Sequence, residues 1–358
     1  MKKKHGPMVF EGWNGPGKRD GVIEPLHPAE DGLHIDPRKR GEYEWWYFDA
    51  HLDTGHIIVV FFHASNPNPG MGGKSGVEIV LLRPDGKKTR KFIPCGKKDF
   101  IASREKADVR CGENRLTVEH PPEGLPVYRI HVEDKDISCH LTFRASINGW
   151  KPGSGQSRFG GMGYFAWVVP CARASVEGTI ADGTRTLKVT GIGYHDHNWL
   201  NFPFPRIITY WMWGRIYSDN YTVSYAYIQC NARMGNYAVK VLMAAREREI
   251  ILSTGEFDFI SENFRYNDGA RHRYPEKLTI QIPGEFEAKL SVARVLEAEN
   301  MLDNFGPLLK FIAKNLLRLR PGYFRLASDF ELLISHNGQT ARETGTTLHE
   351  FVLFAPVE

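Results

Sequence analysis

The regular return of short β-like segments limits the fold of this chain more than any other feature. Aromatic and β-branched residues run from Trp45 to Phe62 and are interrupted at Asp53–Gly55, which is the pattern of a β-hairpin. Similar segments recur along most of the sequence, separated by turn signals such as Asp182-Gly183. Short strands at this spacing are typical of antiparallel barrels and sandwiches. We therefore predict an all-β fold.

The length of the chain predicts two domains rather than one. A chain of 358 residues is long for a single hydrophobic core. The prolines of the segment 201–205 would break strand pairing, so we place the boundary there. The predicted organisation is an N-terminal extension over residues 1–40, a first antiparallel β-barrel over 41–203 and a second one over 204–358.

One segment has a clear helical period. Leucines, Phe311 and Ile312 share one side of residues 303–319, and Lys310, Lys314 and Arg318 lie on the other. This pattern predicts an amphipathic helix in the second barrel. Two interpretations are open: the helix covers a barrel mouth or sheet edge, or it is a basic lid that makes peripheral contact with a membrane or a lipid-like substrate.

Composition narrows the class of partner and the expected location. The net charge of +4 is spread along the chain without a long basic stripe, so we predict no nucleic-acid binding. The five cysteines are widely spaced and form no C-x-x-C, which argues against a disulfide framework and a structural zinc site. Free thiols suit a reducing compartment. The basic start of the chain is not followed by an apolar stretch, so we expect a cytoplasmic protein.

The segment Gly191–Leu200 holds two histidines, an aspartate, an asparagine and a tryptophan within ten residues. Buried polar groups need partners, so the segment builds either a functional site or a hydrogen-bonded corner. On a strand, side chains alternate between faces, so His195, His197 and Trp199 share one face and Asp196 lies on the other with Asn198.

No cofactor is predicted from the sequence. The pair His195 and His197 could supply two metal ligands on one face, but Asn198–Asn201 follows where a cupin-type site would carry a glutamate. We therefore predict no metal site. The chain also has no G-x-S-x-G nucleophile elbow, no P-loop and no strand-linked G-x-G-x-x-G.

The aromatic strands predict a pocket for a largely apolar ligand. A carboxyl group desolvated among aromatic rings stays protonated near neutrality and can protonate a carbon–carbon double bond. The faces of tryptophan and tyrosine rings would stabilise the resulting cation. Asp219 is the first candidate acid, with Asp196 and Asp49 as alternatives. The predicted substrate-binding residues are Trp211, Trp213, Trp46, Glu44, Asp196 and Tyr225.

Several of these residues also have simpler structural interpretations. Asp219 begins a good turn pair with Asn220. Asp196 could accept backbone hydrogen bonds at a corner, and Trp211 with Trp213 could fill a barrel. Glu44 could pair with an arginine such as Arg215 or Arg158.

Two motifs carry a resemblance to a known family. Glu44–Phe48 followed by His51–Gly55, and Gly193–Trp199 followed by the strand Tyr210–Tyr217, resemble the carotenoid 1,2-hydratase (hydroxyneurosporene synthase) and AttH-type lipocalin-like proteins. The resemblance runs from about Gly41 to Val357. It implies two consecutive lipocalin-like barrels. Members of the superfamily include hydratases of isoprenoid double bonds, kievitone hydratase and decalin-forming Diels–Alderases.

The resemblance also implies a catalytic set. A His-x-Trp pair and a downstream Tyr-x-Asp match His197 with Trp199 and Tyr217 with Asp219, although Leu200 stands where a glycine often follows the tryptophan. Asp219 would be the general acid, and Tyr217 and His197 would orient water or relay the proton. The first predicted function is a cofactor-independent hydratase or cyclase of an apolar isoprenoid or polyene. The alternatives are a pericyclase and a non-catalytic lipid or isoprenoid carrier.

Overall fold

We describe a computed structural model of the chain over residues 9–68, 72–96, 98–183, 185–304, 310–311 and 319–355. It is an all-β structure that divides into two compact units. The N-terminal half-barrel comprises Ile23–Ser157 and Gly163–Phe202. The C-terminal half-barrel comprises Met1–Val22, Arg158–Met162 and Pro203–Glu358. The segment 1–40 is therefore divided between the two units.

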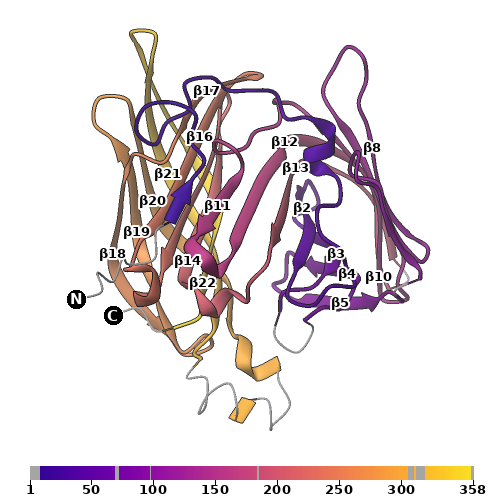
Figure 1. Ribbon diagram of the computed structural model, residues 1–358. Helices are drawn as coiled ribbons and strands as arrows, with labels where there is room; N and C mark the ends of the chain where they lie inside the picture. Colours follow the sequence, from indigo (N-terminus) through magenta and orange to yellow (C-terminus); the bar gives the residue numbers. More distant parts are fainter. Residues whose placement is uncertain are drawn as a thin grey trace. The chain divides into compact units, whose positions relative to one another are not determined.

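The N-terminal half-barrel is one curled antiparallel sheet (Figure 1). In their order across the sheet, its strands are β5 (Lys88–Pro94), β4 (Gly76–Leu82), β3 (Ile57–Ser65), β2 (Tyr43–Leu52), β13 (Arg185–Leu200), β12 (Tyr164–Asp182), β10 (Ile137–Ala145), β9 (Val127–Val132), β8 (Asn114–Glu119), β7 (Val109–Cys111) and β6 (Phe100–Ala102). The first and last long strands along the chain, β2 and β13, pair with each other. The edge strands are β5 and β6, so the sheet curls without forming the closed barrel that we predicted.

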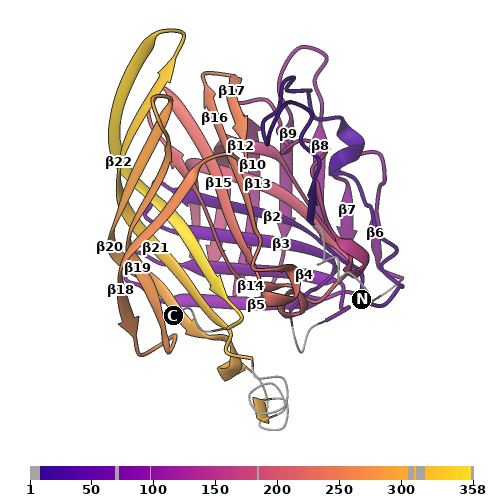
Figure 2. The ribbon, with the colours of Figure 1, turned by 60° about the vertical axis from the view of Figure 1, so that its left-hand side comes forward.

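The C-terminal half-barrel repeats this plan (Figure 2). Its strands lie in the order β17 (Glu249–Thr254), β16 (Ala238–Arg246), β15 (Tyr221–Cys230), β14 (Ile208–Tyr217), β22 (Gln339–Leu353), β21 (Gly322–His336), β20 (Phe286–Asn300), β19 (His272–Ile282) and β18 (Asp258–Asn267). Again the first and last strands, β14 and β22, pair, and two strands that follow each other in sequence form the edges.

Residues 18–20 cover one of these edges. The amide of Asp20 donates to the carbonyl of Ser253 at 3.0 Å, and Arg19 forms a β-bridge with Thr254. The Arg19 guanidinium also forms an ion pair with Glu285, in the turn between β19 and β20. These contacts satisfy backbone groups at the end of β17 that would otherwise face solvent as an unpaired edge.

Each sheet buries one face on its own hydrophobic core. In the N-terminal half-barrel, Trp46 and Phe48 from β2 are buried together with Phe143 from β10. In the C-terminal half-barrel, Tyr225, Phe324 and Phe351 form the equivalent cluster. These aromatic and β-branched side chains recur at every second residue of their strands, which is why the sequence pattern predicted β structure.

The remaining elements are short. They are β1 (Val9–Glu11), β11 (Gln156–Phe159) and the 3₁₀ turns η1 (Pro28–Asp31), η2 (Gly160–Met162), η3 (Phe204–Arg206), η4 (Ala232–Met234) and η5 (Met301–Asn304). The helix predicted at 303–319 lies mostly outside the described residues, so it stays a prediction, as does its membrane contact. Among the residues that are described, no helix has the length and apolar character needed to cross a bilayer.

Candidate functional site

The polar motif predicted from the sequence lies within β13 rather than at a corner. Residues 191–200 pair with β2 over their full length, with Asp196 opposite Tyr47 and His197 opposite Trp46. The alternation predicted from the sequence is confirmed. His195 and His197 point to the core side of the sheet, where His195 stacks on Phe48 at 3.9 Å between ring centroids. Asp196 and Asn198 lie on the opposite face.

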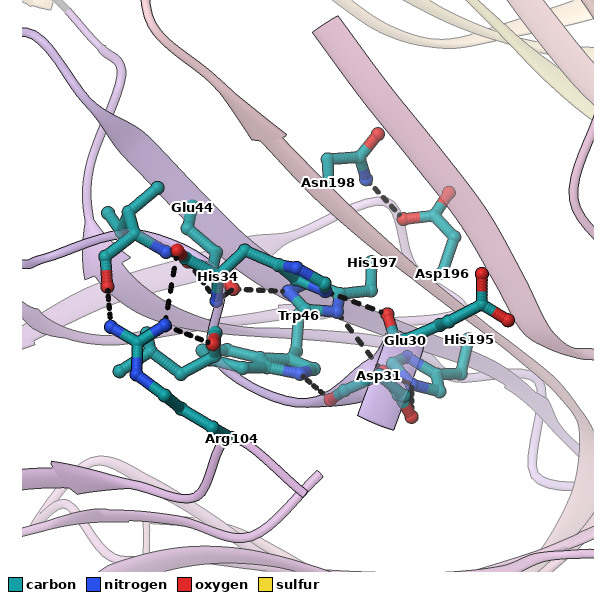
Figure 3. Close-up of polar contacts among 12 residues, drawn as sticks. Glu30, Asp31, His34, Glu44, Trp46, Arg104, His195, Asp196, His197 and Asn198 are labelled. Atoms are coloured by element: carbon teal, nitrogen blue, oxygen red, sulfur yellow. Dashed lines mark hydrogen bonds and ion pairs between the residues drawn. The ribbon is translucent and has the colours of Figure 1, made fainter. Parts of the chain in front are cut away.

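Asp31 joins the two histidines on the core side (Figure 3). Nε2 of His195 lies 3.1 Å from Oδ2 of Asp31, and Nδ1 of His197 lies 3.3 Å from Oδ1. The second contact is an ion pair whose angle is poor for a hydrogen bond. The hydroxyl of Tyr128 donates to Oδ2 of Asp31 at 3.0 Å. One carboxylate therefore connects three side chains from β13 and β9.

Glu44 is the second carboxylate of this cluster. Its Oε1 lies 2.9 Å from Nε2 of His197, and its carboxylate also accepts hydrogen bonds from the backbone amides of His34 and Ile35. These partners take the place of the arginine that the structural alternative for Glu44 proposed. The buried Glu44 carboxylate accepts its hydrogen bonds from nearby backbone amides. A guanidinium group was therefore not needed to satisfy it.

The two carboxylates change the protonation of His197. Burial lowers the pKa of His197, but its contacts with Asp31 and Glu44 outweigh burial and raise that pKa to about 9. Burial likewise opposes ionisation of Asp31, yet His195 and His197 hold the pKa of its carboxyl well below the usual range. At neutral pH the cluster therefore contains an imidazolium between two carboxylates.

The segment 27–36, which we call the strap, supplies Asp31. At its start, His27 and Glu30 form a capping box around η1. The guanidinium of Arg104 donates to the carbonyls of Leu33 and Ile35, each at 3.0 Å. A Cβ on Gly32 would lie 2.4 Å from the carbonyl oxygen of Arg104, so only glycine fits there. The strap is therefore fixed against the end of β6.

The core-side cluster is closed to solvent. His195, His197, Glu44 and Trp46 are all 0% exposed, and the Trp46 indole donates to the carbonyl oxygen of Asp31 at 2.9 Å. His34 stacks on Trp199 with 3.7 Å between ring centroids. In this arrangement, His197 and Trp46 cannot touch a substrate unless the strap moves. In the described structure both side chains contact Asp31 of the strap.

Asp196 occupies a different environment on the other face of β13. Its carboxylate accepts three hydrogen bonds: from the Trp167 indole at 3.0 Å, the Tyr194 hydroxyl at 2.9 Å and the Asn198 amide at 2.8 Å. Tyr47 lies directly opposite on β2. The hydrogen-bond partners of Asp196 are therefore side chains. The prediction that Asp196 accepts backbone hydrogen bonds at a corner is wrong.

This environment also changes the protonation of Asp196. Burial raises the pKa of the Asp196 carboxyl to about 6, although its three hydrogen-bond donors favour the ionised form. Asp196 is 6% exposed and the neighbouring Trp167 is 7% exposed, whereas His197 has no exposed surface. Both polar clusters on β13 are buried, and the one around Asp196 retains slightly more exposed surface.

Asp219 does not have the environment that its predicted role required. It lies exposed in the turn between β14 and β15. The burial among aromatic rings on which the predicted proton donor depended is therefore absent at Asp219. Asp219 and Tyr217 also belong to the C-terminal half-barrel, whereas His197 and Trp199 belong to the N-terminal one. The turn interpretation of Asp219 fits the structure.

The predicted aromatic residues of β14 share one face, as expected, but that face is opposite the core. Met212 and Ile216 enter the hydrophobic core, so Trp211, Trp213 and Tyr217 point away from it. The Trp213 indole donates to Glu350 at 3.0 Å. These tryptophans therefore do not line the interior of their own half-barrel.

Tyr225 lies inside the C-terminal half-barrel, within a small polar group. Its hydroxyl is 3.2 Å from Nδ1 of His349, whose Nε2 is 3.2 Å from the hydroxyl of Ser328. All three side chains are buried. Gly214 is adjacent, and a Cβ there would lie 2.6 Å from the Tyr225 hydroxyl, which explains the glycine in the middle of β14.

His349 should make the fold sensitive to acid. Burial lowers its pKa to about 4 from an ordinary value of 6.5. Below pH 6.5, His349 is protonated in the unfolded chain but stays neutral in the folded chain. The free energy of unfolding therefore falls from pH 6.5 towards pH 4. We expect the wild type to lose about 3 kcal/mol more than His349→Gln between pH 7 and pH 4, measured by urea denaturation. His336→Gln, at the end of β21, is the control and should behave as wild type. Equal pH dependence in wild type and His349→Gln would contradict this expectation.

Comparison with known proteins agrees with this architecture. Residues 137–272 match the Diels-Alderase-like family. This match, the relative and the solved structures described next are all similar to the AttH-type proteins that the sequence motifs resemble. Hydroxyneurosporene dehydrogenase from Chlorobaculum tepidum is 26% identical over 212 residues. That match covers 50% of this chain and 54% of the relative, which is about half its length.

Three solved structures of the superfamily share the fold. An AttH-type protein from Nitrosomonas europaea has a TM-score of 0.61 at 15% identity, over 93% of this chain and 98% of that one. Kievitone hydratase from Nectria haematococca has a TM-score of 0.57 at 16% identity, over 97% and 98%. CghA with Sch210972 has a TM-score of 0.59 at 13% identity, again over 97% and 98%.

Sequence reasoning missed Asp31, His34 and Arg104. The sequence contained only an indirect signal for Asp31. Two histidines on the core-facing side of a strand require buried hydrogen-bond acceptors, and Glu44 was the single carboxylate already predicted near them. The second acceptor comes from a segment more than 160 residues away along the chain. The sequence did not identify which of its carboxylates that would be.

Proposed function

We propose that this chain is a cofactor-independent hydratase or cyclase that protonates a carbon–carbon double bond of an apolar isoprenoid or polyene. The observation that carries the proposal is the buried Asp196 carboxyl, whose pKa is about 6. A general acid works best when its pKa is near the operating pH. Kievitone hydratase and hydroxyneurosporene dehydrogenase, two of the similar proteins, give the substrate classes by analogy.

The residues around Asp196 suit both stages of such a reaction. Protonated Asp196 gives its proton to an alkene carbon, and the carbocation is stabilised by nearby aromatic faces such as those of Trp45 and Trp167. Water then adds to the cation, and its excess proton returns to the Asp196 carboxylate. The hydrogen bonds from Trp167 and Tyr194 stabilise that carboxylate in the interval. In a cyclase, a second double bond of the substrate attacks the cation in place of water, and the new cation loses a proton from a neighbouring carbon to the Asp196 carboxylate.

A pericyclase is the second candidate, because the match to the Diels-Alderase-like family includes β13 with Asp196. In that case the protonated carboxyl of Asp196 and the Asn198 amide would donate hydrogen bonds to a carbonyl of the substrate. They would polarise a dienophile without transferring a proton to carbon.

An experiment in heavy water distinguishes alkene protonation from a pericyclic reaction. We would incubate the protein in D₂O with neurosporene, farnesol and kievitone, and analyse the products by mass spectrometry. Protonation of an alkene is expected to place one deuterium on a product carbon. A product without a carbon–deuterium bond would favour the pericyclase. Binding of all three probes without any product would favour a carrier and contradict both enzymatic functions.

A further inference from the structure

A second group of titratable side chains lies on the N-terminal half-barrel, away from the residues that bind Asp196. His131 on β9 and His140 on β10 face each other directly across the two strands. Their rings meet edge to face with 4.2 Å between centroids. Both side chains are at least partly exposed, so the pair is open to solvent ions.

Glu133 completes the group from the end of β9. Its Oε1 lies 2.6 Å from Nε2 of His140 and 3.9 Å from Nε2 of His131. Two imidazole nitrogens therefore point to one carboxylate oxygen. The backbone amide of Glu133 donates to the side chain of the buried Asn114 at 2.8 Å, which fixes the position of the acid.

We propose that His131, Glu133 and His140 form a binding site for a divalent transition-metal ion of the zinc type. Two imidazoles and one carboxylate are a donor set that zinc accepts, with a fourth position left to water. The three ligand atoms lie within 4.8 Å of one another. Tetrahedral zinc places its ligands roughly 3.3 Å apart, so small rotations of exposed side chains are sufficient.

The strands around the proposed site have one feature that favours metal binding and one that opposes it. The two histidines lie on paired strands, so little backbone ordering is needed on binding. Arg115 on β8 is directly opposite His131 and brings a positive charge to the same face. That charge is solvent-screened and its side chain is long, so it weakens the site without blocking it. The bound ion would tie β9 to β10 and stabilise the half-barrel.

This inference does not depend on the proposed function and is tested without a substrate. The full chain, stripped with a chelator, is titrated with ZnCl₂ by calorimetry and with Co²⁺ by absorption spectroscopy. We expect one ion per chain at this site and a four-coordinate cobalt spectrum. His131→Ala and His140→Ala should each weaken zinc binding by at least about tenfold, since even residues that merely orient metal ligands have effects of that size.

Two further measurements make the result specific. Zinc should raise the melting temperature of the wild type more than that of His140→Ala, because the folded wild type binds the ion more tightly. His336→Ala, which removes a histidine from the C-terminal half-barrel, should bind zinc as the wild type does. Absence of zinc binding, or unchanged binding in both His131→Ala and His140→Ala, would overturn the proposal and leave Glu133 and His140 as an ordinary surface ion pair.

Discussion

Replacing Asp196 with asparagine should reduce turnover by about 10²–10⁴-fold, the usual contribution of a general acid. Asparagine keeps the shape of the side chain and an oxygen that can accept a hydrogen bond from Trp167 or Tyr194. Its amide has no acidic proton to transfer to a substrate. The measurement is product formation from whichever probe the heavy-water experiment identifies. A melting curve of the variant checks that β13 is still folded.

The pH dependence of the wild type gives independent evidence. With a pKa of about 6, the protonated fraction of Asp196 falls about tenfold for each pH unit above 7. Turnover should therefore decline in proportion between pH 7 and pH 9. A rate that stays constant over this range would mean that no acid with the pKa of Asp196 takes part.

Asp219→Asn is the matched control, because it makes the same chemical change at an exposed turn. We expect its turnover to equal that of the wild type. The opposite pattern, with Asp219→Asn inactive and Asp196→Asn active, would contradict our assignment and restore the acid that the sequence motif suggested.

Strand alternation was the part of the site that the sequence predicted well. The side chains of β13 and β2 lie on the predicted faces because both strands are long, regular and paired without a bulge between them. The faces of β14 were also correct. Alternation does not reveal which face meets the core, and the alternative in which Trp211 and Trp213 fill the barrel interior does not fit the structure, because their face points away from the core.

The failed assignment of Asp219 has a simple physical cause. Motif matching gives the residue type at a position but not its solvation, and the pKa of a carboxyl depends mainly on solvation and neighbouring charges. Asp219 lies two residues beyond Tyr217, the last paired residue of β14, and its side chain is exposed to solvent. Asp196 lies in the middle of a strand with neighbours on both sides, where burial is expected.

Asp31→Asn should destabilise the N-terminal half-barrel by about 3–5 kcal/mol, the usual cost of removing one partner from a buried ion cluster. The change leaves His195 without its anionic partner and His197 with Glu44 alone. Urea denaturation at pH 7 measures the loss. Asp36→Asn is the matched control on the same strap, since Asp36 pairs with the exposed Arg38, and its stability should stay close to that of the wild type.

The stability difference between the wild type and Asp31→Asn should depend on pH, and this dependence identifies which contact of Asp31 causes it. His197 has a folded pKa of about 9 and an ordinary value of 6.5, so its stabilising charge is fully present below pH 6.5 and is lost as the pH rises through 9. The gap between wild type and Asp31→Asn should therefore be smaller at pH 10 than at pH 7. An equal gap at both values would show that Asp31 acts through its contact with Tyr128 or through packing, because neither depends on the charge of His197.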